Sequence, residues 1–317
     1  MTATVGSGAF TYEPLESWGN LPEGMRLIEC PGVAVDANDR VFVLTRNPEN
    51  PIVIFESDGS YVGTFGKGSF TDRSHGITIT PDGSIYCVDD GTHTVTKWTP
   101  EGELVMTIGV PGQPAPAWSG QPFNRPTHVA QSPITGHLYV TDGYGNARIH
   151  KYTPDGELVK SWGEPGIDPG QFLLPHNIAI DENDLLYVAD REAHRVQVFD
   201  ADGNVVTCWS NIYRPDGLTL GPDGNIYIGE LSGNAPLPPG IGHRVSILDR
   251  QGNLLARFGD PEEGDAPGKF IAPHGVAVDS HGDVYVSEVC YTIRGRAMQP
   301  PTEYTSLKKL RRMTPAA

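Results

Sequence analysis

A short motif recurs six times along this chain of 317 residues and constrains its fold more than any other feature. The motif is a proline, or in one copy a serine, followed by apolar residues at alternating positions. The copies begin at Pro31, Ser74, Pro126, Pro175, Pro215 and Pro273. Their spacing of about 48 residues lies near the ~40–50 residues of a propeller blade.

One repeat unit contains four short segments that alternate with a period of two residues, which is typical of strands. In the second unit these segments are 76–80, 85–88, 94–98 and 104–108. The first two are separated by a Pro-Asp-Gly turn. Six units of four antiparallel strands, with no helical stretch, predict an all-β, six-bladed β-propeller.

The two ends of the chain are predicted to meet in one blade. The last unit has a third strand near 306–313 and no fourth strand after it, whereas residues 13–19 resemble the fourth strand at 157–163. We therefore expect an N-terminal strand at about 11–19 to complete the sixth blade and close the ring. Residues 1–317 then form one domain, and an extended loop at 291–304 is a hypothetical lid.

Charge and composition argue against several functions. The net charge is −16, whereas nucleic acids and anionic membranes bind basic surfaces. The N-terminus lacks the features of a signal peptide, and no stretch approaches the ~18 apolar residues of a membrane helix. The four cysteines show no disulfide spacing, which predicts reduced thiols in a cytoplasmic protein.

Histidine occupies one repeat position in every second unit. The residues that follow the motif's first residue are Gly32, His75, Thr127, His176, Asp216 and His274. Equivalent positions in alternate blades of a six-fold ring lie about 120° apart, so the three imidazoles should converge on the axis. A single histidine of this kind usually packs against its own turn, but three together predict a metal site with an open position. His128 lies one residue after this repeat position, so its side chain should point away from the direction that is equivalent to that of His75.

A second loop of each unit, between its second and third strands, should lie at the same end of the channel. An acidic residue recurs there in five units, which indicates a structural role in binding turn amides. The variable residues that follow are more informative. Arg46, Tyr144 and Arg191 are predicted to face the metal.

Several stretches resemble a known family, the NHL-repeat propeller of peptidyl-α-hydroxyglycine α-amidating lyase. The resemblance covers about 41–288 and is densest in 125–130, 139–149, 161–164, 175–176 and 188–192. It implies zinc on His75, His176 and His274, a functional arginine and tyrosine at Arg46 and Tyr144, and a further arginine at Arg191. The implied reaction cleaves the C–N bond of a carbinolamide and releases an amide and glyoxylate.

Two positions depart from that family. Gly145 stands where the family has a half-cystine, and Gly275 stands where it has an acid for a structural calcium, so calcium is left open. We therefore expect a small, anionic α-hydroxy substrate rather than a peptide hormone. The oligomeric state is not predicted.

Three functions remain open at this stage. The first is a lyase in which the metal acts as Lewis acid, Tyr144 as general base and Arg46 as a stabiliser of negative charge. The second is a metal-dependent hydrolase of a lactone or amide. The third is a non-enzymatic NHL interaction platform. Zinc is the expected metal, with iron, manganese or cobalt as alternatives, because imidazole does not suit calcium.

Overall fold

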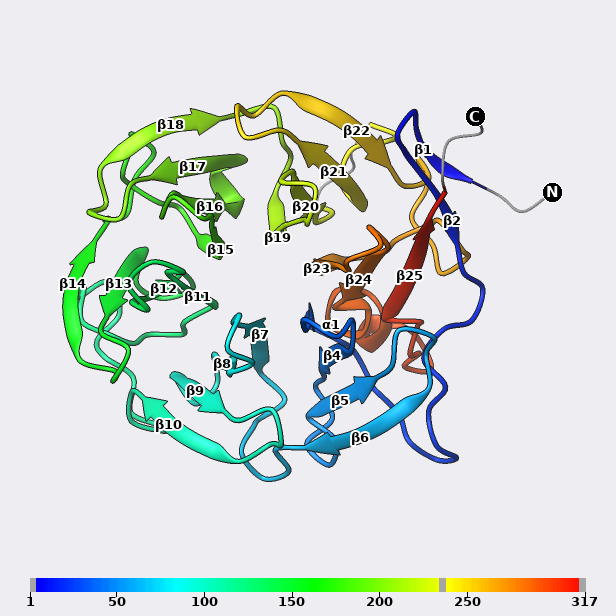
Figure 1. The fold of residues 1–317 in the computed structure, drawn as a ribbon, viewed down its shortest axis with the longest axis horizontal. Helices are drawn as coiled ribbons and strands as arrows, with labels where there is room; N and C mark the ends of the chain where they lie inside the picture. Colours follow the sequence, from blue (N-terminus) through cyan, green and yellow to red (C-terminus); the bar gives the residue numbers. More distant parts are fainter. Residues whose placement is uncertain (1–3, 234–237, 314–317) are drawn as a thin grey trace.

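Six antiparallel sheets, the blades, surround a central axis (Figure 1). The computed structural model of the chain describes residues 4–233 and 238–313. Blade 1 consists of β3 (Gly32–Val35), β4 (Val41–Leu44), β5 (Ile52–Phe55) and β6 (Tyr61–Phe65). Blade 2 consists of β7 (Ser74–Ile79), β8 (Ile85–Asp89), β9 (Thr94–Trp98) and β10 (Leu104–Ile108). Blade 3 consists of β11 (His128–Gln131), β12 (Leu138–Asp142), β13 (Arg148–Tyr152) and β14 (Leu158–Trp162).

The remaining blades follow the same order from the axis outward. Blade 4 consists of β15 (Pro175–Ile180), β16 (Leu186–Asp190), β17 (Arg195–Phe199) and β18 (Val205–Trp209). Blade 5 consists of β19 (Pro215–Leu220), β20 (Ile226–Glu230), β21 (Arg244–Leu248) and β22 (Leu254–Phe258). Blade 6 consists of β23 (Pro273–Val278), β24 (Val284–Glu288), β25 (Leu307–Arg312), β2 (Phe10–Pro14) and β1 (Val5–Ser7). The predicted six-bladed β-propeller is confirmed.

The blades pack face to face around the ring, and the hydrophobic core lies in the seams between them. Between blades 1 and 2, for example, Phe42 and Ile54 belong to one buried cluster with Ile85 and Trp98. The second strand of every blade contributes one of the largest fully buried side chains, and these are Phe42, Tyr86, Tyr139, Tyr187, Tyr227 and Tyr285. Each innermost strand contacts the next, so six strand starts surround one channel.

The N-terminal strand closes the ring, as predicted. Tyr12 pairs with Arg312 and Pro14 with Leu310, so β2 becomes the fourth strand of the sixth blade, and β1 adds a fifth. The strand ends at Pro14 instead of continuing to residue 19. Beyond it the chain turns into the seam between blades 6 and 1, where the Trp18 ring packs against Phe55 and Tyr285.

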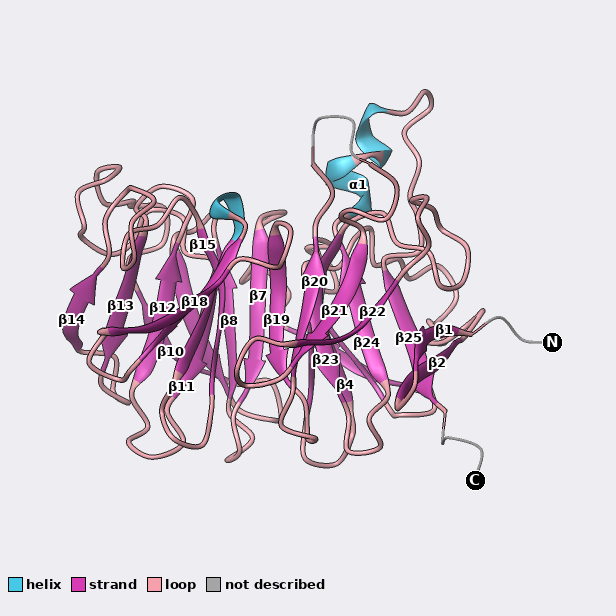
Figure 2. Ribbon diagram, turned by 90° about the horizontal axis from the view of Figure 1, so that it is seen from above, coloured by secondary structure: helices cyan, strands magenta, loops and turns pink. Residues whose placement is uncertain are grey.

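The extended loop rises above one end of the ring (Figure 2). It contains a four-residue helix, α1 (Cys290–Ile293), and a 3₁₀ turn, η2 (Gly295–Ala297). A second 3₁₀ turn, η1 (Arg191–Ala193), lies in blade 4. The sequence pattern did not predict these short helices, because each is a single turn within a loop.

Tyr12 tests the contribution of the closing strand. Its side chain is fully buried in the seam between blades 5 and 6, with its ring 5.0 Å from that of Phe258. We expect Tyr12→Ala to lower the free energy of unfolding by about 3–5 kcal/mol, because it leaves a cavity in a core. Glu13→Ala on the same strand removes an exposed ion pair with Arg311 and should cost less than about 1 kcal/mol. Chemical denaturation of both variants measures the free energy of unfolding. Equal losses in the two variants would contradict the expected contribution of Tyr12.

Candidate metal centre

Three histidines meet at one end of the channel. His75, His176 and His274 are each the second residue of an innermost strand, and none is more than 4% exposed. Their ring centroids form a nearly equilateral triangle with sides of 4.7, 4.7 and 4.8 Å. The alternate-blade spacing thus brings the three rings together at one point.

Each of these rings is oriented by a backbone carbonyl of the next blade. The three Nδ1 atoms donate to the carbonyl oxygens of Thr127, Asp216 and Pro31 at 2.7, 3.0 and 2.6 Å. A carbonyl can only accept, so Nδ1 carries the hydrogen and Nε2 keeps its lone pair. This is the arrangement in which a second partner fixes the tautomer of a metal-binding imidazole.

Burial keeps the imidazoles of His75 and His274 neutral. Burial, followed by the neighbouring His176 and His274, holds the pKa of His75 well below its usual value of 6.5. Burial is also the main reason why the pKa of His274 falls to about 3. Neutral imidazole is the form that binds metal.

The donor set fits zinc. The candidate ligand atoms all lie within 4.8 Å of one another, and zinc commonly takes three histidines with an open fourth position. In 4–233 and 238–313 no other group of three His, Cys, Asp or Glu side chains is close enough to share an ion. The three histidines can therefore hold one divalent metal.

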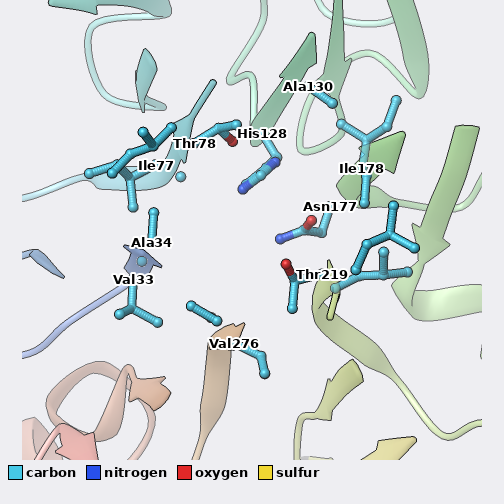
Figure 3. A pocket seen from close by; sticks show the side chains of 18 of the residues that line it. Val33, Ala34, Ile77, Thr78, His128, Ala130, Asn177, Ile178, Thr219 and Val276 are labelled. Atoms are coloured by element: carbon cyan, nitrogen blue, oxygen red, sulfur yellow. The ribbon is translucent and has the colours of Figure 1, made fainter. Parts of the chain in front are cut away.

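The channel does not fit the structural calcium. It continues from His75 and His274 as a cavity of about 310 Å³, and none of its described lining residues is acidic. Figure 3 shows His128 and Asn177 pointing into it, and neither the Nδ1 of His128 nor the Oδ1 of Asn177 has a hydrogen-bond partner. A Cβ atom at Gly275 would meet Ser287 Oγ at 2.4 Å, so an acid there would have to displace this hydroxyl group. Calcium prefers several carboxylate or carbonyl oxygens.

Tyr144 lies directly beside the histidines, in the loop after β12. Its Oη is 3.0 Å from His75 Nε2 and 3.2 Å from His176 Nε2. The sequence predicted that Tyr144 faces the metal's end of the channel. Burial raises the pKa of Tyr144 even though the neighbouring Arg191 acts to lower it.

Arg46 is held at the same end of the channel and is only 7% exposed. Its Nη1 donates to Glu29 Oε1 at 2.7 Å and to Thr292 Oγ1 at 2.9 Å. Thr292 belongs to α1, so the extended loop contacts the site through this arginine. Glu29 was missed by the sequence analysis because it lies outside the repeat positions.

Arg191 reaches the histidines through an acid. Its Nη1 donates to Asp216 Oδ1 at 3.1 Å, and the same oxygen is 2.9 Å from His176 Nδ1. Its Nε also donates to Glu192 at 2.9 Å, and its guanidinium lies 5.6 Å from the centre of the Tyr144 ring. Arg46, Tyr144 and Arg191 are thus all close to the histidine cluster.

The recurring acids of the second loop have the structural role that the sequence indicated. Glu288, for example, accepts the amides of Ile271 and Ala272 at 2.6 and 2.7 Å, and Asp190 accepts those of Leu173 and Leu174. Each acid thereby anchors the loop that arrives from the preceding blade.

Two arginines near Tyr144 were not predicted, Arg73 and Arg125. Each directly precedes a motif start, and Arg214 does the same in blade 5. Arg125 lies over the Tyr144 ring, with its Cζ 4.5 Å from the centroid. Arginine thus occupies the position just before the motif in three of the six units, and the positions after the motif do not carry this signal.

Comparison with known proteins places the chain in a family. The NHL repeat model matches residues 172–199. Human NHL repeat-containing protein 3 is 30% identical over 280 residues, which are 81% of this chain and 76% of the relative. The chain belongs to the NHL repeat family. The likeness therefore extends well beyond the single matched repeat.

Other relatives carry enzyme names. Peptidyl-glycine alpha-amidating monooxygenase A of Xenopus laevis is 30% identical over 86% of this chain, which spans 30% of that protein's length. Peptidyl-alpha-hydroxyglycine alpha-amidating lyase 1 of Drosophila melanogaster is 32% identical over 76% of this chain and 47% of its own length. The NHL propeller is thus related to amidating-lyase propellers.

Solved structures bear on the fold alone. A streptogramin B lyase structure matches with a TM-score of 0.62 and 15% identity over 96% of this chain and 99% of that one. Among the described residues, no helix has the length and apolar character needed to cross a membrane.

Metal binding can be measured directly. We expect the metal-free protein to take up one zinc ion per chain, and His176→Ala to weaken binding by more than about 100-fold because one of three ligands is lost. His128→Ala is the matched control, since that ring lies in the channel below the cluster, and its affinity should stay within about threefold of wild type. Calorimetry and metal analysis provide the measurement. Undiminished zinc binding by His176→Ala would exclude this site.

Acid should destabilise the metal-free protein partly through His274. The folded pKa is about 3, whereas an unfolded histidine titrates near 6.5, so below pH 6.5 the unfolded state binds the extra proton. The stability advantage of wild type over His274→Gln should therefore shrink by roughly 1 kcal/mol per pH unit below about 6.5. Denaturation in a chelator between pH 7.5 and 5 measures it. A constant difference would show that this imidazole titrates normally.

Proposed function

We propose that this chain is a metal-dependent lyase that cleaves the C–N bond of an α-hydroxyglycine amide, releasing an amide and glyoxylate. The observation that carries the proposal is the position of Tyr144 Oη, within hydrogen-bonding distance of two histidine Nε2 atoms. The names of relatives that are 30–32% identical support the reaction class.

The metal, for which zinc is our candidate, would be held by His75, His176 and His274. When bound, it supplies Lewis-acid polarisation of a substrate oxygen and a positive charge that favours the phenolate form of a neighbouring tyrosine. Imidazole ligands carry no charge of their own, so they would not neutralise the positive charge of the bound ion.

Tyr144 moves the proton in this mechanism. Its Oη takes the proton of the substrate's α-hydroxyl group. The oxygen then forms the C=O bond of glyoxylate, the C–N bond breaks, and the leaving amide nitrogen receives the proton back from Tyr144.

Arg46 and Arg191 orient the substrate and stabilise negative charge. Both are almost fully buried, and both are held by carboxylates, Arg46 by Glu29 and Arg191 by Asp216. Such fixed guanidinium groups need little reorganisation when charge develops. A cationic pocket in an acidic protein selects a small anionic substrate.

We also propose a reducing, cytoplasmic location. All four cysteines are free, and Cys30, Cys87 and Cys290 are buried. Burial raises the pKa of Cys30 to about 12, so this thiol stays protonated and unreactive.

Tyr144→Phe tests the mechanism. With N-benzoyl-α-hydroxyglycine as substrate and zinc-loaded protein, we expect glyoxylate release to slow by about 10²–10⁴-fold, because the proton acceptor is gone. Zinc content should not change. Tyr213→Phe, in a loop of blade 5 where Tyr213 packs on His194, is the matched control and should keep full activity.

Two results would overturn the proposal. Full glyoxylate release by Tyr144→Phe would remove the proposed base. Formation of benzoate instead of benzamide would identify a hydrolase that attacks the amide carbonyl.

A further inference from the structure

A guanidinium group with little compensating charge lies next to Tyr144. Asp90, whose side chain is fully buried, is bound in a fork by Arg73, with contacts of 2.8 and 2.6 Å. Arg125 makes only one longer contact to the same carboxylate, 3.2 Å from Nη2 to Oδ2. One carboxylate thus serves two arginines, and one positive charge is left over.

Arg125 has donors to spare. Within the described part of the chain, the contact to Asp90 is the one hydrogen bond that its guanidinium makes, and arginine has five N–H donors. Its side chain is 39% exposed, in contrast to 11% for Arg191. Arg46 and Arg191 are each already held by a buried carboxylate, whereas Arg125 is more exposed and can bind an additional group of a ligand.

The backbone fixes where this group lies. Arg125 has a φ of 63°, in the left-handed region, and its N–H donates to His93 Nδ1 at 3.0 Å. Its Cζ lies 4.5 Å from the centroid of the Tyr144 ring. The hydroxyl oxygen of the same ring lies 3.0 and 3.2 Å from the Nε2 atoms of His75 and His176, so the surplus charge lies over the tyrosine whose hydroxyl group reaches the metal centre.

We propose that Arg125 binds a second anionic group of the substrate, and that the substrate is an α-hydroxyglycine whose short acyl part carries its own carboxylate. The inference rests on the proposed function, in which the carboxylate of the α-hydroxyglycine part of the substrate binds near the metal. Guanidinium binds carboxylate through paired N–H donors, and such charge-assisted bonds are stronger than neutral ones. A short acyl chain is expected because the guanidinium lies over the ring of the same tyrosine whose hydroxyl group contacts the histidines.

The test uses two ligands that cannot react because they lack the α-hydroxyl group. N-succinylglycine carries the second carboxylate, and N-succinamoylglycine replaces it with an uncharged amide of the same shape. By calorimetry at low ionic strength, we expect the zinc-loaded wild type to bind the first at least tenfold more tightly. Arg125→Gln should reduce this preference to less than about threefold.

Two further variants separate binding from folding and from net charge. Arg125→Gln keeps the fork between Arg73 and Asp90, and its zinc content and melting temperature should match wild type. Arg125→Lys should recover part of the preference because the charge returns. Arg40→Gln removes a partly exposed arginine that is paired with Asp36 in another loop, and it should keep the full preference.

The outcomes distinguish this inference from the proposed function. Equal binding of the two ligands by wild type, no binding of N-succinylglycine, or an unchanged preference in Arg125→Gln would each overturn the role of Arg125, even if glyoxylate is released from N-benzoyl-α-hydroxyglycine. If the preference depends on Arg125 but no glyoxylate is released, the anion site stands and the lyase proposal fails.

Discussion

Closure of the ring by β2 is the constraint on which the rest of the structure depends. Three residues of β2 pair with β25, and Tyr12 fills the seam between blades 5 and 6. The blades can form an unbroken ring of packed seams only if the last sheet is complete. The three histidines come from blades 2, 4 and 6, so they share one point because the ring closes at six.

The seams also determine the chemistry of the histidines. Each imidazole extends from one blade and donates its Nδ1 hydrogen to a carbonyl of the next, so blade packing fixes the tautomer at the centre. The burial that stabilises the seams also lowers the pKa of His75 and His274. The preorganised orientation of the three imidazoles therefore follows from the packing of the blades.

Around this triad the charges are distributed unequally. Arg46 and Arg191 are buried and matched by carboxylates, whereas Arg125 shares its carboxylate with Arg73. The matched pairs resist ligand-induced change because separating them would leave a buried charge unpaired. Binding of a ligand to the guanidinium of Arg125 need not separate such a buried pair. Selectivity for the substrate is therefore expected to depend on Arg125 more than on the buried pairs of Arg46 and Arg191.

The repeat in the sequence by itself determined the six blades, the strand order and the three converging histidines, because symmetry turns equal spacing along the chain into equal angles around an axis. The positions of Arg46, Tyr144 and Arg191 followed from the same symmetry. Tertiary structure alone decided where the closing strand ends, since Trp18 fills a seam that no local pattern reveals. It also decided the ionic partners, because Glu29 meets Arg46 and Asp90 meets Arg125 across separate loops. Such pairs depend on distances between segments, and residue spacing within one repeat does not encode them.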